Sequence, residues 1–134
     1  MSQVRVSDAA DFLGVSTDTV RRLIASGRLA AEKDAGGRTV VDGRGLAEYV
    51  RSEGRSVADP TSVSRSARNR FVGIVTDVVS DRVMSQVELQ CGPHRVVSLI
   101  STESVHELGL EPGVVAVAVV KATNVALETP GERR

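Results

Sequence analysis

The side chains that most often carry catalysis are few in this sequence and stand apart from one another. The two histidines, His94 and His106, are isolated, and the segment from Cys91 to His94 offers two metal ligands, too few to complete a zinc site. Asp77 and Asp81 are expected at a strand end and in a turn rather than as a carboxylate pair. The sequence also lacks a glycine-rich phosphate-binding signature. These observations predict a binding protein and not an enzyme.

A second group of chemically capable residues lies near the start of the chain, on a predicted helix. Ser16 is expected to cap this helix, because a serine hydroxyl accepts a hydrogen bond from an amide of the first turn. Val20, Leu23 and Ile24 recur at helical spacing and should pack inward. Four polar residues are then left to point outward: Thr17, Asp18, Arg21 and Arg22. Hydroxyls and arginine side chains at a helix N-terminus suit the major groove of double-stranded DNA.

The elements around this helix should form a small helical domain over residues 1–53. Ser7 is expected to cap a preceding helix, and Asp42 to cap a third one after the second. Between the second and third helices, residues 29–31 and 39–41 predict a two-stranded ribbon around a turn at 35–37. Three basic residues flank or tip the ribbon, where they could contact the DNA backbone: Arg28, Lys33 and Arg38. Two acidic residues of the ribbon would repel phosphate and could lower nonspecific affinity: Glu32 and Asp34.

The order helix, turn, helix, two-stranded wing and helix resembles a winged helix-turn-helix. Residues 6–24 in particular resemble the start of the MerR-type and excisionase-type DNA-binding domains. The resemblance implies double-stranded DNA as a partner, and a helical module that binds protein remains the alternative. A single domain of this kind makes few base contacts, so useful affinity requires at least a dimer.

Residues 54–64 predict a flexible linker, because they are rich in serine and threonine and contain Gly54 and Pro60. From Phe71 onward β-branched residues predict strands over 71–79, 82–90, 95–100 and 114–121, a last short strand over 124–127, and a helix over 103–108. Val83, Val87 and Leu89 should share one strand face. We therefore expect an α+β multidomain protein with a small β-barrel over residues 65–128 and a tail over 129–134.

Four short motifs of the second half occur in the order typical of the Mop domain: Ser66-Ala67-Arg68-Asn69, Ser101-Thr102-Glu103-Ser104, Leu108-Gly109-Leu110 and Val120-Lys121-Ala122-Thr123. They resemble the molbindins and the molybdate-sensing half of bacterial molybdate-responsive regulators, whose TOBE-type fold is an OB-like barrel. The resemblance implies a site for molybdate or tungstate between subunits, lined by Ser66, Arg68, Ser101, Ser104, Lys121 and Ala122. It also implies a homo-oligomer, at least a dimer, with a hexamer as the larger alternative.

These residue types suit a tetrahedral dianion, which presents only hydrogen-bond acceptors. Serine hydroxyls donate hydrogen bonds, Arg68 and Lys121 supply positive charge, and the small Ala122 lets the backbone approach closely. The helix expected near Thr102 should add unpaired backbone N–H groups at its start. As the alternative, Ser101 only caps this helix and Lys121 is a solvated strand end.

Composition narrows the class of protein further. The formal net charge is zero, yet residues 55–70 hold four arginines against one aspartate, so positive charge gathers in the middle of the chain. Aromatic residues make up only 2%, which argues against a stacking platform for single-stranded nucleic acid. The longest apolar run, residues 114–120, is too short to cross a bilayer, and no signal peptide is recognisable. We expect a cytoplasmic protein with no membrane partner.

The combined interpretation is a one-component transcriptional regulator that binds DNA through its first domain and molybdate or tungstate through its second. The anion is a ligand here and no catalytic cofactor is expected. Two alternatives remain open. One is an oxyanion buffer or storage protein with an N-terminal protein-interaction module, and the other is a regulator whose second domain only assembles subunits.

Overall fold

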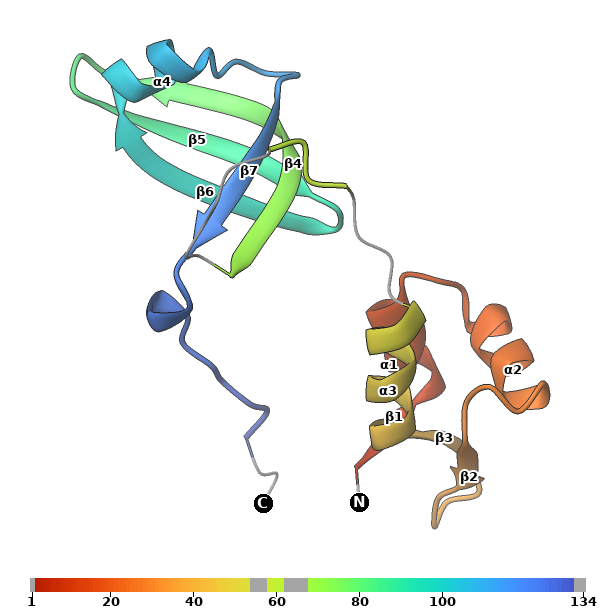
Figure 1. Cartoon of the computed structure of the whole chain (residues 1–134). Helices are drawn as coiled ribbons and strands as arrows, with labels where there is room; N and C mark the ends of the chain where they lie inside the picture. Colours follow the sequence, from red (N-terminus) through yellow and green to blue (C-terminus); the bar gives the residue numbers. More distant parts are fainter. Residues whose placement is uncertain (1, 54–57, 62–67, 132–134) are drawn as a thin grey trace. The chain divides into compact units, whose positions relative to one another are not determined.

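The computed structural model describes residues 2–53, 58–61 and 68–131 and divides into two compact units, residues 1–56 and 57–134. Helices dominate the first unit and a curled antiparallel sheet forms most of the second (Figure 1), so the architecture is α+β with two domains. None of the helices in the described part of the chain has the length and apolar content needed to span a membrane.

The first unit is a three-helix domain with a small sheet. Its elements are β1 (Gln3–Arg5), α1 (Val6–Leu13), α2 (Thr17–Ala25), β2 (Ala31–Lys33), β3 (Thr39–Asp42) and α3 (Gly43–Glu53). The strands are antiparallel in the order β1-β3-β2, so β3 lies between the hairpin partner β2 and the N-terminal strand β1. This is the winged helix-turn-helix arrangement, with the β2–β3 hairpin as the wing.

Short polar side chains determine where two of these helices begin. The Ser16 hydroxyl accepts from the amide of Thr19 at 3.1 Å and caps α2, and the Asp42 carboxylate accepts from the amide of Gly45 at 3.0 Å at the start of α3, as predicted. The prediction for Ser7 was wrong, because α1 begins at Val6 with Arg5 at its N-cap and no side-chain cap. The pairing of β1 with β3, which aligns Arg5 with Val40, leads the chain directly into this helix.

Apolar residues from all three helices and from β3 form the core of the first unit. Val20 of α2 and Val41 of β3 are completely buried, and Ala9 and Leu46 pack beside them. Leu23 and Ile24 lie partly buried against this cluster, so the predicted apolar stripe of α2 does face inward. The opposite face of α2 is therefore left to solvent.

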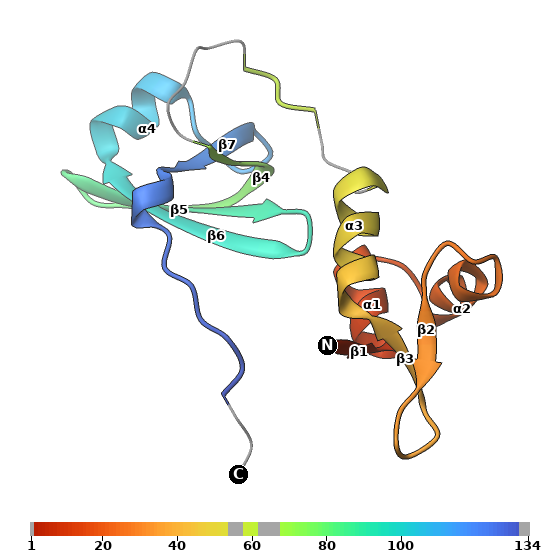
Figure 2. The same cartoon turned by 60° about the horizontal axis from the view of Figure 1, so that its bottom comes forward.

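The second unit is a four-stranded antiparallel sheet with one helix. Its elements are β4 (Asn69–Ser80), β5 (Met84–Cys91), β6 (His94–Ser101), α4 (Thr102–Leu108), β7 (Val115–Val120) and the 3-10 turn η1 (Ala122–Asn124). The strand order is β6-β5-β4-β7. The long strand β4 pairs with β7 through its first half and with β5 through its second, with a bulge between Val75 and Asp77. This division lets the sheet curl into a half-barrel (Figure 2).

Two details of the predicted barrel were wrong. Residues 124–127 form no strand: η1 follows β7, and the chain then continues without pairing as far as the structure describes it. Val83 does not share a face with Val87 and Leu89, because the Asp81 carboxylate accepts from the amides of Val83 and Met84 and prolongs the turn. Val83 is 70% exposed in that turn, and Ser85, 1% exposed, lies on the buried face instead.

Gly73 lies where β4 approaches the end of β5 closely. A Cβ atom at this position would lie 2.6 Å from the Cys91 Sγ and 2.6 Å from the Gln90 carbonyl oxygen, so only glycine fits without displacing its neighbours. The buried side chains beside it are apolar, namely Val75, Val87, Leu89, Cys91 and Val105. β4 can therefore cross closely over the end of β5 at this point.

Candidate functional site

The exposed face of α2 carries the residues predicted to contact DNA. Thr17, Asp18, Arg21 and Arg22 are all exposed, and Arg21 and Arg22 form no ion pair within the described ranges. In Figure 2 α2 lies on the β2 side of the wing, and β3 leads directly into α3. Two cations and the amides of a helix start are thus presented on a convex, solvent-facing helix.

The other residues predicted to contact DNA lie in or beside the wing, and their side chains have different partners. The Lys33 ammonium donates to the Thr39 hydroxyl at 2.8 Å across the hairpin, and Arg38 is exposed in the turn. Arg28 instead turns toward α3, where its guanidinium lies 3.6 Å from the Glu53 carboxylate and 5.8 Å from the centre of the Tyr49 ring. Part of the charge of Arg28 is therefore neutralised within the unit.

The two acidic residues of the wing have structural partners. The Asp34 carboxylate accepts from the amides of Gly36 and Arg38, both at 2.9 Å, and so holds the hairpin turn together. The Glu32 carboxylate accepts from the Gln3 side chain at 2.7 Å, which connects β2 to the N-terminal strand. Both side chains shape the wing, and this accounts for acidic residues on a surface predicted to approach phosphate.

One half of the predicted oxyanion site lies at the start of α4. The Ser101 hydroxyl accepts from the amide of Ser104 at 3.1 Å and donates its own proton to the Ser104 hydroxyl at 2.8 Å. Ser101 thus caps the helix, and its hydroxyl proton is already used. The Ser104 hydroxyl accepts this bond and keeps its own proton to donate, and because such chains polarise one another it is the stronger donor of the two.

Fewer backbone amides are available at this helix start than the sequence suggests. The Thr102 amide donates to the Val83 carbonyl at 2.8 Å, and the Ser104 amide is bonded to Ser101. Thr102 is itself buried, and its hydroxyl donates to the Asp81 carbonyl and contacts the Ser85 hydroxyl at 2.8 Å. The side-chain hydroxyl of Ser104 is therefore one donor that α4 still offers.

The other half of the predicted site lies where β4 begins and β7 ends. Asn69 aligns with Val120, and its side-chain amide donates to the Val120 carbonyl at 3.1 Å. Arg68 directly precedes β4 and Lys121 directly follows β7, so each lies one residue beyond this pair, and both are exposed. Ala122 follows at the start of η1. Two cations are thus brought to one end of the sheet by residues far apart in sequence, while Ser66 lies outside the described residues.

A single chain does not bring these two halves together. Lys121 lies beside the first residue of β4, whereas Ser101 aligns with Met84, which follows the turn after the last residue of β4. Figure 1 accordingly shows α4 and η1 at opposite ends of the sheet. Within the described part of the chain, the serine donors and the cations form two separate groups, named here the two half-sites of the predicted site.

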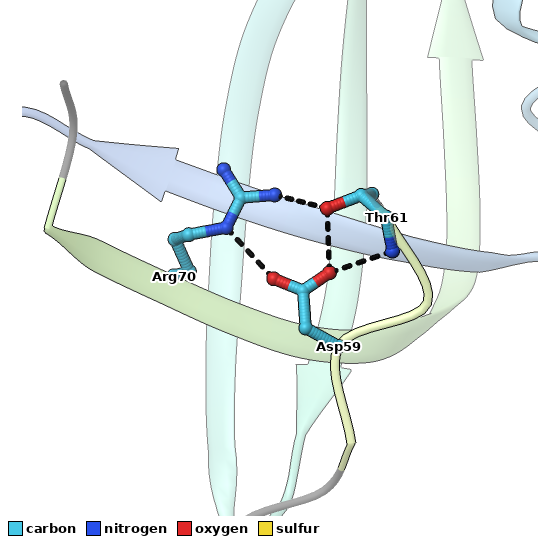
Figure 3. Close-up of polar contacts among 3 residues, drawn as sticks. All are labelled: Asp59, Thr61 and Arg70. Carbon is cyan, nitrogen blue, oxygen red and sulfur yellow. Dashed lines mark hydrogen bonds and ion pairs between the residues drawn. The ribbon is translucent and has the colours of Figure 1, made fainter. Parts of the chain in front are cut away.

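Sequence reasoning missed a polar cluster next to the cationic half-site. The Asp59 carboxylate contacts the Arg70 Nε at 2.7 Å and accepts from the Thr61 hydroxyl, and the Arg70 guanidinium donates to that hydroxyl at 2.6 Å (Figure 3). Side-chain exposure is only 13% for Arg70 and 23% for Asp59. The signal in the sequence is Asp59-Pro60-Thr61, a turn-forming triplet inside the segment predicted to be a linker.

Hydrogen bonds and burial shift the pKa values of three other groups in the second unit. The pKa of Asp81 is lowered because the amides of Met84 and Val83 donate to its carboxylate, and that of Glu88 is lowered by its hydrogen bond from Arg95. Burial raises the pKa of the Cys91 thiol, which makes it a poor nucleophile. Among the described residues, no cluster of three or more potential metal ligands occurs.

Comparisons with known proteins agree with this division of the chain. A helix-turn-helix domain model matches residues 4–54, and a TOBE domain model matches residues 65–127. Molybdenum-pterin-binding protein 2 of Clostridium pasteurianum is 39% identical over 66 residues, which are 48% of this chain and 97% of that protein. Molybdenum-pterin-binding protein 3 of the same organism is 38% identical over 66 residues, with the same coverage.

A solved structure adds a relative with a bound ligand. The cytoplasmic molybdate-binding protein ModG, with molybdate bound, is 29% identical and aligns with a TM-score of 0.50 over 69% of this chain and 74% of that one. In ModG the bound ligand is molybdate. Through its second unit the chain therefore belongs to the same TOBE-domain family as the molybdenum-pterin-binding proteins, and it carries a helix-turn-helix domain ahead of that unit.

Proposed function

We propose that this chain is a molybdate- or tungstate-responsive transcriptional regulator that binds double-stranded DNA through α2 and the wing. The second unit binds the oxyanion at a site formed between copies of the chain. The observation that carries this proposal is the pair of half-sites: a serine donor at the start of α4 and two cations at the end of β7. Each half resembles part of an oxyanion site, and neither is complete within one copy.

The unpaired surface of the second unit supports the assembly that such a site requires. An apolar groove of about 600 Å³ extends between the edge strands β6 and β7 and is lined by residues such as Val96, Ile100 and Val117. Burying such a surface is favourable, because about 25 cal/mol is gained for each Å² of apolar area removed from water. A second copy that covers this surface would bring the Ser104 end of one chain toward the Lys121 end of the other. A dimer is the minimum, and a hexamer repeats the same contacts.

The chemistry of the two halves predicts which anions bind. Molybdate and tungstate are dianions that only accept hydrogen bonds, and the Ser104 hydroxyl, Arg68 and Lys121 only need to donate. Monohydrogen phosphate carries a proton that requires an acceptor, which Arg68 and Lys121 cannot supply and serine does not readily supply. Sulfate differs from molybdate only in size, so discrimination against sulfate should be the weaker of the two.

Calorimetry on the full chain tests the oxyanion site. Molybdate and tungstate should bind much more tightly than phosphate, and Lys121→Ala and Ser104→Ala should each weaken molybdate binding about tenfold or more, since each removes a hydrogen bond to a charged group. Arg44→Ala, which removes an exposed cation of the first unit, is the matched control and should bind molybdate as the wild type does. Equal affinity for all four anions would contradict a dedicated site.

DNA binding is tested separately with the α2 arginines. Arg21→Ala and Arg22→Ala should each weaken binding to a selected operator by about 1–3 kcal/mol, the usual value of a bidentate base contact. Molybdate affinity and oligomeric state should stay unchanged, because these side chains are exposed on the first unit. Wild-type operator affinity in both variants would rule out α2 as the helix that contacts the bases.

Regulation requires that the two ligands influence each other. A coupling free energy of about 1–3 kcal/mol would change operator affinity by roughly 5- to 150-fold when molybdate is present. In Lys121→Ala this molybdate effect should disappear while the anion-free protein binds DNA normally. A Gly-Ser insertion directly after Glu53, ahead of the Asp59 cluster, should preserve both binding events and reduce the coupling. An undiminished molybdate response in the insertion variant would leave assembly as the only route for the signal.

A further inference from the structure

A short segment ahead of the sheet is attached to the start of β4 by side chains. The Arg70 Nε donates to the Asp59 carboxylate at 2.7 Å, and the Arg70 guanidinium also donates to the Thr61 hydroxyl at 2.6 Å (Figure 3). With side-chain exposures of 13% and 23%, Arg70 and Asp59 form the most buried ion pair of the described residues. Water and salt therefore screen it less than the other pairs.

The segment is shaped for this contact by its own sequence. The Asp59 carboxylate accepts from the amide of Thr61 at 2.8 Å and from its hydroxyl at 2.6 Å, which closes a turn around Pro60. The proline ring fixes one backbone angle of this turn, so less conformational entropy is lost when the segment is held on the sheet. One carboxylate thus both forms the turn and attaches it to Arg70.

The attachment changes the effective length of the stretch that joins the two units. With the contact formed, residues 54–59 lead from the end of α3 to an anchored residue; with it broken, residues 54–70 lead to Arg70 on the sheet. A chain spans at most about 3.5 Å per residue, so the maximum reach is roughly 20 Å in the first case and roughly 60 Å in the second. The contact therefore limits how far the first unit can extend from its anchor.

We propose that Asp59, Thr61 and Arg70 form a clip that shortens this connection and thereby restricts the separations at which two α2 helices can bind an operator. The inference rests on the proposed function, because it needs an assembly with two first units and an operator with two half-sites. Thr61 and Arg70 also line the groove that a second copy is proposed to cover. A copy on this groove would shield the clip further from water, so assembly favours the closed clip.

Spin labels on the full chain measure whether the clip is closed. In a Cys91→Ala background, Ala58→Cys carries one nitroxide on the attached segment and Arg82→Cys carries the other in the turn after β4; both positions are exposed. The labelled protein is diluted into unlabelled protein, so that distances within one copy are measured. The distance distribution should be narrow, and Asp59→Ala should broaden it at least about twofold, because an unattached segment samples many separations.

The matched control for this measurement is Glu88→Gln. It removes the ion pair with Arg95, which is more exposed and lies on the same sheet, and should leave the distribution narrow. A broad distribution in the chain that keeps Asp59, or an equally narrow one after Asp59→Ala, would overturn the inference.

Two insertions of equal length separate a clip from a cluster that only stabilises the sheet. A short Gly-Ser insertion directly after Glu53 lies ahead of the clip, and the same insertion directly after Thr61 lies behind it. When the clip is closed, only the first lengthens the connection between the units. Binding is measured to operators whose two half-sites are separated by different numbers of helical turns.

The insertion after Glu53 should raise the affinity for separations wider than the preferred one at least about tenfold, because a linker that cannot span two sites forfeits their avidity. The insertion after Thr61 should leave the wild-type preference unchanged. In an Asp59→Ala background the two insertions should become equivalent. Equal effects of the two insertions in the chain that keeps Asp59 would overturn the inference.

Molybdate and operator titrations on the same variants distinguish a failure of the clip from a failure of the proposed function. Asp59→Ala is expected to leave molybdate affinity unchanged, which also reports that the second unit is folded. Unchanged spin-label distances in this variant, combined with normal binding of both ligands, would reject the clip alone. A chain that shows the expected spin-label distances and binds neither molybdate nor any operator would reject the proposed function.

Discussion

The two units of this chain differ in how much apolar surface they leave uncovered. Among the described residues, the first unit exposes three large apolar side chains, Phe12, Val15 and Val50, whereas the second exposes twelve. Those of the second unit lie on every strand of the sheet and beyond it, and they include Leu99 on β6 and Val119 on β7. The first unit covers most of its own apolar surface. The second resembles part of a larger fold.

The difference follows from the elements that each unit uses. Three helices enclose a core on several sides, and the small sheet of the first unit covers what remains. A four-stranded open sheet with one short helix covers only part of one face and leaves the strands β6 and β7 at its edges. Exposed edges and apolar faces invite pairing with another chain. A binding site divided between the two ends of such a sheet is therefore suited to completion by assembly.

The largest loss of stability is expected from Gly73→Ala, which should destabilise the second unit and leave the stability of the first unchanged. The new Cβ would meet the Cys91 Sγ and the Gln90 carbonyl at 2.6 Å, and the carbonyl belongs to rigid strand backbone. We expect a loss of about 3 kcal/mol, at the upper end for overpacking. Urea unfolding, monitored separately for the two units, measures it. Gly131→Ala, with open space around the Cβ, should have no effect.

Leu99→Ser tests whether the exposed apolar residues on the outer face of the sheet, outside the groove, are also covered in solution. Leu99 is 67% exposed, so its replacement in an isolated subunit should change the unfolding free energy little. If a second copy covers it, the dissociation constant of the assembly should rise about 10- to 150-fold, from about 1.5–3 kcal/mol of lost burial. Sedimentation equilibrium reports this constant. Gln86→Ser changes the cross-strand neighbour without removing a large apolar group, and should leave assembly intact.

Asp59→Ala tests the cluster that ties residues 58–61 to the sheet. It leaves the guanidinium of Arg70, which is only 13% exposed, without its carboxylate partner. We expect the unfolding free energy of the second unit to fall by about 1–3 kcal/mol, the cost of an unsatisfied buried polar group. Glu88→Gln breaks a more exposed pair, with Arg95 58% exposed, and should cost less. Equal losses in the two variants would show that burial does not strengthen the Asp59 contact.

The smallest change in stability is expected when the pH is lowered. The pKa values of Asp81 and Glu88 are lowered in the folded state, so their contribution to stability is complete above their unfolded values of about 3.8 and 4.5. It should be lost as the pH falls through the lowered folded values. Melting temperatures measured across this range should fall less steeply for Asp81→Asn than for the wild type. Glu128→Gln, in the exposed tail, should follow the wild-type curve.

Much of the fold could be predicted because local signals determine it. The Ser16 and Asp42 caps, and the left-handed glycines after α1 and α4, place helix ends within a residue or two. The strand β1 was not anticipated, because three residues carry too little pattern and depend on a partner far along the chain. The predicted strand over 124–127 failed for the same reason, since no neighbouring strand in the described chain pairs with it.

For the candidate site, the sequence proposes the members but not their arrangement. Residue types and motif order indicate Arg68, Ser101, Ser104 and Lys121, because an oxyanion requires donors and positive charge. Only the strand register shows that the serines and the cations lie at opposite ends of β4. The partners of Arg28 in α3 also depend on contacts that sequence spacing does not predict.

The position of the only cysteine allows local opening of the second unit to be measured by thiol labelling. Cys91 is 7% exposed, its Sγ contacts the Phe71 carbonyl at 3.7 Å, and the first unit contains no thiol. A thiol reagent can therefore modify the wild-type chain only when β4 separates from the end of β5. The labelling rate measures how often this happens, without interference from the first unit. If oxyanion binding and assembly close the second unit, labelling of Cys91 will slow as molybdate is added.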